Sequence, residues 1–97
     1  MDKELKKAYQ EKTEAQLKEW SAKAEELKTK AESMSADAKV KAMEKIVGLK
    51  QKVREGREHL ENIESAGEGQ WETLKAKMEG ISEGIKNTIH DMTSPSD

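Results

Sequence analysis

The feature that most restricts the fold of this chain is a regular spacing of apolar and small residues in its first half. The spacing alternates between four and three at Thr13, Leu17, Trp20, Ala24, Leu27, Ala31, Met34 and Ala38. This alternation is the heptad pattern of helices that pack along a narrow apolar stripe. Large residues alternate with alanine along the stripe, so a neighbouring helix can approach closely. The pattern predicts a long helix in tight contact with another helix, and it suits an antiparallel pair without fixing the orientation.

Two further segments repeat the helical period. The second comprises Ala42, Ile46, Leu49, Val53, Gly56, Leu60 and Ile63. The third comprises Trp71, Leu74, Met78, Ile81, Ile85, Ile89 and Met92. Charged residues make up 39% of the 97 residues and Phe is absent, which excludes a thick globular core. Helices need only a narrow apolar stripe, so the predicted fold class is all-α.

Two breaks divide the helical pattern. Residues 65–70 (SAGEGQ) contain two glycines and a serine, and Gly67 is placed to end a helix in the left-handed conformation. In residues 33–37, Ser35 is suited to cap a new helix and Asp37 to occupy its first turn. Residues 33–37, the first break in chain order, contain no Gly or Pro, so a helix that continues through them remains an alternative.

With both breaks, the chain forms a single antiparallel three-helix bundle over residues 1–92, followed by a frayed tail at 93–97. The helical segments run at about 3–33, 36–64 and 70–92. An up-down-up arrangement brings Trp20 near Leu49 and Ile85. Without the first break, a helix of about 60 residues exposes part of its stripe and needs a second chain.

The same arrangement brings Trp71 near Tyr9 at the other end of the bundle. The bundle is thin, so we expect the chain to form a homo-oligomer whether or not the first break is real.

Charge and composition exclude several kinds of protein. There are 18 Lys and Arg residues against 20 Asp and Glu residues, interspersed along the chain, for a net charge of −2. No basic patch stands out, so we expect no nucleic-acid partner. The absence of cysteine excludes disulfides and thiolate metal sites. Residues 1–9 lack an apolar signal region and no apolar run reaches transmembrane length, so we expect a cytoplasmic protein.

The sequence offers little for catalysis. His59 and His90 are the only histidines, and they fall on different predicted helices. Glu55 precedes His59 by one helical turn, which is the spacing of a surface pair. No metalloprotease motif, phosphate-binding loop or nucleophile elbow occurs. We therefore expect no enzyme activity, no cofactor and no metal site.

Four glycines interrupt the predicted helices, at Gly48, Gly56, Gly80 and Gly84. Each costs about 1 kcal/mol relative to alanine in a helix interior. One interpretation is that helices come into close contact at these points. The other is that the C-terminal helix opens easily and exchanges partners.

The C-terminal helix also admits two interpretations. On a helical wheel, Lys75, Lys77 and Lys86 flank its apolar face, and glutamates lie beyond them. Lysines border the core of many bundles in this way. The same pattern is typical of an amphipathic helix that lies on a lipid surface, where the lysine stems cover apolar area.

Three segments resemble a known family. They are residues 14–27 (EAQLKEWSAKAEEL), 35–53 (SADAKVKAMEKIVGLKQKV) and 65–77 (SAGEGQWETLKAK). Together they resemble small bacterial coiled-coil proteins described as stress-response proteins. The resemblance implies a cytoplasmic helical protein that is induced under stress, and it supplies no catalytic residues. Residues 46–49 (IVGL) are more apolar than the second helix usual in that family, which adds a contact surface.

Two functions follow as hypotheses. The first is an interaction protein that self-associates and docks its amphipathic helices on a protein partner. The second is a reversible binder of a membrane, lipid or granule surface that acts through the C-terminal helix, with Gly67 and Gly69 as hinge candidates. The candidate contact residues for either function are Trp20, Leu27, Trp71, Leu74, Met78, Ile81 and Ile85.

Overall fold

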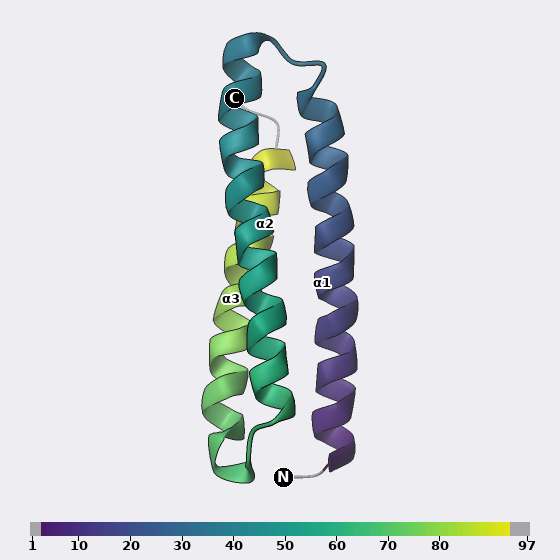
Figure 1. Cartoon of the computed structure of the whole chain (residues 1–97), viewed down its shortest axis with the longest axis vertical. Coiled ribbons are helices and arrows are strands. Elements are labelled where there is room, and N and C mark those ends of the chain that lie inside the picture. The colour runs from purple at the N-terminus through teal and green to yellow at the C-terminus, as the bar shows by residue number, and fades with distance from the viewer. Residues whose placement is uncertain (1–2, 94–97) are drawn as a thin grey trace.

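The computed structural model describes residues 3–93, and this part of the chain contains three long helices and no strand. The elements are α1 (Lys3–Ala31), α2 (Ala36–Glu64), the short 3-10 helix η1 (Glu68–Gln70) and α3 (Trp71–Thr93). The long helices run up, down and up in a rod that measures 51 × 19 × 19 Å (Figure 1). The prediction of an all-α antiparallel bundle of three helical segments is confirmed.

The first break is real. Helix α1 ends at Ala31, two residues before the predicted end, and the chain turns over residues 32–35. The Ser33 hydroxyl donates to the Lys30 carbonyl at 3.1 Å, and the Met34 amide donates to the Ala31 carbonyl at 3.1 Å. These bonds to the third preceding residue tighten the last turn and end the α-helical pattern. The alternative of one continuous helix is therefore wrong.

Helix α2 begins after Ser35, which has the extended backbone of an N-cap residue (φ −60°, ψ 159°). Its hydroxyl makes no capping hydrogen bond, although the position was predicted correctly. The Ser35 carbonyl accepts a bond from the Lys39 amide at 2.8 Å, and Asp37 lies in the first turn as expected. A carboxylate there is favourable because the N-terminal end of a helix is partly positive.

The second break does not use a left-handed glycine. Within residues 3–93 no residue has a positive φ, so the prediction for Gly67 is wrong. Helix α2 ends instead with the Ser65 amide donating to the Glu61 carbonyl at 3.3 Å. The ammonium of Lys6, from the start of α1, donates to the carbonyls of Glu64 at 3.3 Å and Ala66 at 3.0 Å. A cation satisfies these terminal carbonyls, so no glycine conformation is needed there.

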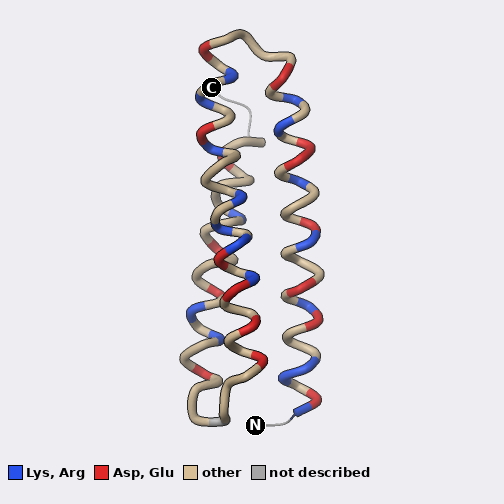
Figure 2. Tube along the Cα trace, viewed as in Figure 1, with Lys and Arg blue, Asp and Glu red and all other residues tan. Residues whose placement is uncertain are grey.

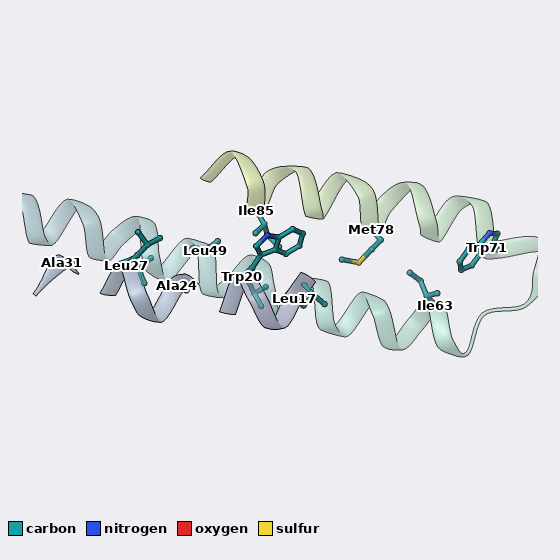
Figure 3. Close-up of a cluster of buried hydrophobic side chains, with 12 residues drawn as sticks. Leu17, Trp20, Ala24, Leu27, Ala31, Leu49, Ile63, Trp71, Met78 and Ile85 are labelled. Carbon is teal, nitrogen blue, oxygen red and sulfur yellow. The ribbon is translucent and has the colours of Figure 1, made fainter. Parts of the chain in front are cut away.

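The core is a single column of side chains along the axis of the rod (Figure 3). The buried hydrophobic residues are Leu17, Trp20, Ala24, Leu27, Ala31, Ile46, Leu49, Val53, Ile63, Trp71, Met78 and Ile85. Every position of the first predicted stripe is buried from Thr13 to Ala31. The last two positions, Met34 and Ala38, are exposed because α1 ends before them.

Both predicted cross-bundle neighbourhoods are present. Trp20, Leu49 and Ile85 belong to the same buried cluster and gather in one part of the core (Figure 3). At the other end, the rings of Tyr9 and Trp71 meet edge to face, with their centroids 5.3 Å apart and their planes at 83°. This is the preferred geometry of an aromatic pair, and it joins α1 to α3.

Polar contacts connect α2 to each neighbour. Lys50 of α2 pairs with Glu25 of α1 at 2.6 Å, and this pairing lowers the pKa of Glu25. Lys52 of α2 donates to the hydroxyl of Thr88 in α3 at 3.0 Å. These exposed contacts add little to the free energy of unfolding, so the apolar column is the main source of stability.

Helix α3 is shorter than its neighbours, with 23 residues against 29 in both α1 and α2. The end of α3 therefore lies below the turn that joins α1 to α2 (Figure 1). Thr93, the first residue of the predicted tail, belongs to α3, and the rest of that tail, 94–97, lies outside the described residues.

Candidate interaction surface

The structure places most of the predicted contact residues inside the bundle. The buried ones are Trp20, Leu27, Trp71, Met78 and Ile85. Leu74 and Ile81 are partly buried and pack against the same core. The five buried side chains reach a partner or a lipid surface only if a helix leaves the bundle. In the closed bundle they serve packing.

The hinge candidates lie in the connection between α2 and α3. Gly67 and Gly69 are both exposed, and a Cβ on either would meet no atom within 4 Å. The Gly67 carbonyl accepts a hydrogen bond from the Gln70 amide at 3.1 Å, which closes the turn of η1. Neither glycine is required by crowding in the closed bundle.

Close helix contact explains one internal glycine. A Cβ on Gly56 would lie 2.8 Å from Leu17 Cδ2 of α1 and 3.3 Å from Met78 Cε of α3. A Cβ on Gly48 or Gly80 would meet nothing within 4 Å. The close-contact interpretation therefore holds at Gly56 and fails at Gly48 and Gly80.

Gly84 has almost as much room as Gly80. The nearest atom to a Cβ placed there is the Lys52 Nζ, at 4.0 Å. The close-contact interpretation therefore also fails at this position, and both glycines of α3 lower its helix propensity without a steric need in the bundle.

His59 is not a surface residue, contrary to the pairing with Glu55 expected from the sequence. Its side chain is buried, and its Nε2 lies 2.8 Å from the Leu74 carbonyl oxygen of α3. Because a carbonyl oxygen can only accept, the hydrogen bond requires a proton on Nε2. This contact depends on where α3 places its backbone, which a sequence pattern cannot show. The role of His59 in the bundle is to bind α3.

Tyr9 occupies a polar edge of the core. Its hydroxyl donates to the Lys75 carbonyl at 3.5 Å, and the Lys75 ammonium lies 5.7 Å from the ring centroid. Burial raises the pKa of Tyr9 above its ordinary value, and the nearby carboxylate of Glu79 raises it further, against a hydrogen bond with Thr13 that lowers it. The neutral phenol is thus the form that the bundle favours.

Acidic and basic residues alternate along all three helices (Figure 2). Most ion pairs join neighbouring turns of one helix, such as Lys18 with Glu14 at 3.6 Å and Lys30 with Glu26 at 3.7 Å. Exposed pairs of this kind contribute at most a few tenths of a kcal/mol, roughly 0.3–0.5. The charges therefore do not define a binding site by themselves.

One surface was not among the predicted contact residues. The exposed large hydrophobic residues are Leu5, Met34, Val40 and Val47. Val40 and Val47 have exposed fractions of 58% and 61%, and both lie on α2. With the half-buried Met43 between them, they line a shallow groove whose other walls are Lys39 and Glu44. We call these five residues the outer α2 stripe.

The signal for the outer α2 stripe was present in the sequence. Val40, Met43 and Val47 follow the helical spacing of three and four, and on a helical wheel Val40 and Val47 lie nearly opposite Leu49. The sequence also indicates an added contact surface at the apolar run 46–49. In the structure Ile46 is buried with Leu49, while Val47 alone faces outward.

Residues 3–93 contain no group of three His, Asp or Glu side chains placed to hold a metal ion. Over the same residues, no helix combines the length and the apolar character that crossing a membrane requires. Comparisons with protein-family models, curated proteins and solved structures gave no match. The resemblance to bacterial stress-response proteins therefore stays a prediction.

Proposed function

We propose that this chain is a cytoplasmic helical interaction protein that works by self-association and by docking on protein partners. The observation that supports the proposal is the outer α2 stripe. Val40 and Val47 expose more than half of their surface although the core residues of α2 are fully covered. The docking face of the proposal is thus the outer side of α2, in place of the stripes around Trp20 and Trp71 expected from the sequence.

Leaving the apolar side chains of the outer α2 stripe in contact with water costs free energy. Fully burying a valine or methionine side chain contributes roughly 1.5–3 kcal/mol. Val40, Met43 and Val47 share one groove, so a single partner helix covers all three. Single exposed hydrophobic residues are ordinary on protein surfaces, but a row at helical spacing on one face is the arrangement that a partner helix binds.

The proposal can be tested by amide NMR spectra recorded over a range of protein concentrations. Self-association through the outer α2 stripe predicts shift changes that are concentrated around residues 36–47 and nearly absent from α3. Changes spread over Trp71, Met78 and Ile85 would instead indicate that the bundle opens to associate. Spectra that do not change with concentration would argue against self-association.

The stress-related part of the proposal rests only on the resemblance of residues 14–27, 35–53 and 65–77. We propose on that ground that the interaction serves a bacterial stress response. The protein should then become more abundant under at least one stress, measured by quantitative mass spectrometry of whole cells. Constant abundance under heat, osmotic and oxidative stress would remove this part and leave the interaction role intact.

A second candidate function is reversible binding to an anionic lipid surface through α3. It is favoured by two features of that helix. Gly80 and Gly84 weaken α3 without filling a packing need, and the exposed Lys77 and Lys86 flank its apolar face. Lysines in that position contact anionic headgroups while the apolar face enters the interface.

Vesicle flotation tests this candidate. The protein should float with vesicles that contain phosphatidylglycerol, and less with neutral phosphatidylcholine vesicles. The variant Lys77→Gln/Lys86→Gln should float less because both side chains are exposed and their loss leaves the core unchanged. Protein that stays at the bottom of the gradient with anionic vesicles would exclude the candidate.

A further inference from the structure

We propose that a second copy of this chain docks on the outer α2 stripe with the two α2 helices parallel, so that Lys39 of each copy pairs with Glu44 of the other. This inference rests on the proposed self-association and adds to it the partner, the orientation and the register. It is argued from the spacing, the charges and the length of the stripe.

The apolar residues of the stripe follow a heptad. If Val40 and Val47 are assigned to position a, Met43 falls at position d, and Ala36 occupies the preceding d. In parallel coiled coils, valine at a combined with leucine at d favours two strands over larger assemblies, and here Met43, a side chain of similar size to leucine, takes the central d position. The seam lies on the side of α2 opposite the buried Leu49, so a second bundle can approach it without displacing α1 or α3.

The charges favour the parallel orientation. Lys39 falls at position g and Glu44 at position e of the following heptad, five residues later. In a parallel pair, g of one helix faces the next e of its partner, which gives two reciprocal Lys39–Glu44 ion pairs. In an antiparallel pair centred on the stripe, Glu44 would instead lie beside its own copy. Neither Lys39 nor Glu44 has an ion-pair partner within residues 3–93.

The seam is short. Its next two heptad positions after Val47 hold Lys50 at d and Arg54 at a, and like charges facing each other across a dimer axis repel. The apolar contact is therefore restricted to about three turns of helix, which is short for a stable interface. The dimer is accordingly weak and reversible.

Charge variants test the pairing. Lys39→Glu and Glu44→Lys each replace both attractive pairs by repulsive ones, so each should weaken dimerisation about tenfold. The double variant Lys39→Glu/Glu44→Lys restores the pairs in a parallel dimer and should recover the affinity of the unmodified chain. In an antiparallel dimer Glu44 and its replacement both lie beside their own copy, so the charge variants remove no attractive pair and the affinity should change little. Sedimentation equilibrium measures each dissociation constant.

Disulfide crosslinking tests the orientation, and the chain is suited to it because it has no cysteine of its own. In a parallel dimer Val40→Cys and Val47→Cys should each crosslink with themselves under mild oxidation. In an antiparallel dimer position a of one helix faces position d of the other, so neither variant should crosslink with itself, and each should crosslink only in a mixture with Met43→Cys. Asn87→Cys, on the exposed side of α3, is the control for random collision.

The outcomes distinguish the parallel dimer from self-association in general. Recovery by the double charge variant together with self-crosslinking at positions 40 and 47 supports the parallel dimer. Association that is insensitive to the charge variants, or crosslinking only in the mixture with Met43→Cys, overturns the parallel dimer and leaves self-association in place. A chain that stays monomeric at all concentrations overturns both.

Discussion

The backbone of Gly56 lies where α1 and α3 both approach α2, and the tip of Leu17 would be 2.8 Å from an added Cβ. Replacement by alanine forces Leu17 and Met78 to move within a filled core, where overpacking costs about 1–3 kcal/mol. Alanine also gains about 1 kcal/mol of helix propensity. The cost of crowding is therefore measured by comparing the Gly56→Ala variant with an alanine variant of an uncrowded glycine.

Gly80→Ala supplies that comparison because nothing lies within 4 Å of its Cβ position. We expect Gly80→Ala to raise the free energy of unfolding by up to about 1 kcal/mol. Gly56→Ala should be about 1–3 kcal/mol less stable than Gly80→Ala, measured by urea unfolding followed by circular dichroism. Equal stability of the two variants would mean that the helices are not packed closely at Gly56.

Tyr9 gives the fold a dependence on alkaline pH. Its pKa is raised above the ordinary value of 10.0, so the folded state holds the phenol proton more tightly than the unfolded state. The stability that this provides is fully present below about pH 10 and is lost as the pH rises through the raised pKa. Tyr9→Phe should therefore lose less stability than the unmodified chain between about pH 9 and 11.

Thermal unfolding at intervals across that range measures the effect, and the comparison of the two proteins removes every pH effect that they share. Identical pH dependence of the two midpoints would show that burial and the Glu79 carboxylate do not affect the Tyr9 phenol in the way the structure implies.

At the scale of the helices, the C-terminal end of α2 depends on a side chain from α1. The Lys6 ammonium bonds the carbonyls of Glu64 and Ala66, at the negative end of the helix dipole. Lys6→Met keeps the stem and removes the charge, and should lower the free energy of unfolding by about 0.5–1 kcal/mol. The matched control is Lys7→Met, an exposed neighbour.

Amide hydrogen exchange locates the effect. Loss of the Lys6 contact should speed exchange in the last turn of α2 around Glu64, and Lys7→Met should leave that turn unchanged. Equal effects from the two variants would contradict a specific role of Lys6 at the end of α2.

The helices themselves could be predicted from the sequence because each carries its own apolar period. The stripe from Thr13 to Ala31, the second break and the Tyr9–Trp71 neighbourhood all followed from local spacing and helix length. What could not be predicted depends on distant groups. The end of α2 needs no left-handed Gly67 because Lys6 arrives from the other end of the chain.

The outer α2 stripe could be predicted from the sequence only in part. The sequence shows that α2 is apolar at residues 40, 43 and 47, but not that Val40 and Val47 face outward, since that depends on which stripe of α2 the other helices cover. The contact residues predicted around Trp20 and Trp71 are indicated by the size of their side chains and by their helical spacing. Those two properties also fit a core, and this is where the structure places both side chains.

At the scale of the whole molecule, residues 3–93 form a rod with a buried core along its axis and an apolar row on the outer face of α2. Val40 and Val47 are far more exposed than any core residue, and they lie on the helix that contacts both neighbours. We therefore expect α2 to use its inner face for folding and its outer face for association. Association can then be abolished without loss of the fold.

Sedimentation equilibrium with circular dichroism on the same samples tests whether the outer face of α2 serves association alone. The unmodified chain should rise from one chain mass towards two with increasing concentration, while Val40→Glu/Val47→Glu stays at one chain mass with the same helix content. Leu5→Glu, at a similarly exposed hydrophobic residue elsewhere, should associate like the unmodified chain. The account would be contradicted if the unmodified chain remained monomeric throughout, or if the valine variant associated equally well.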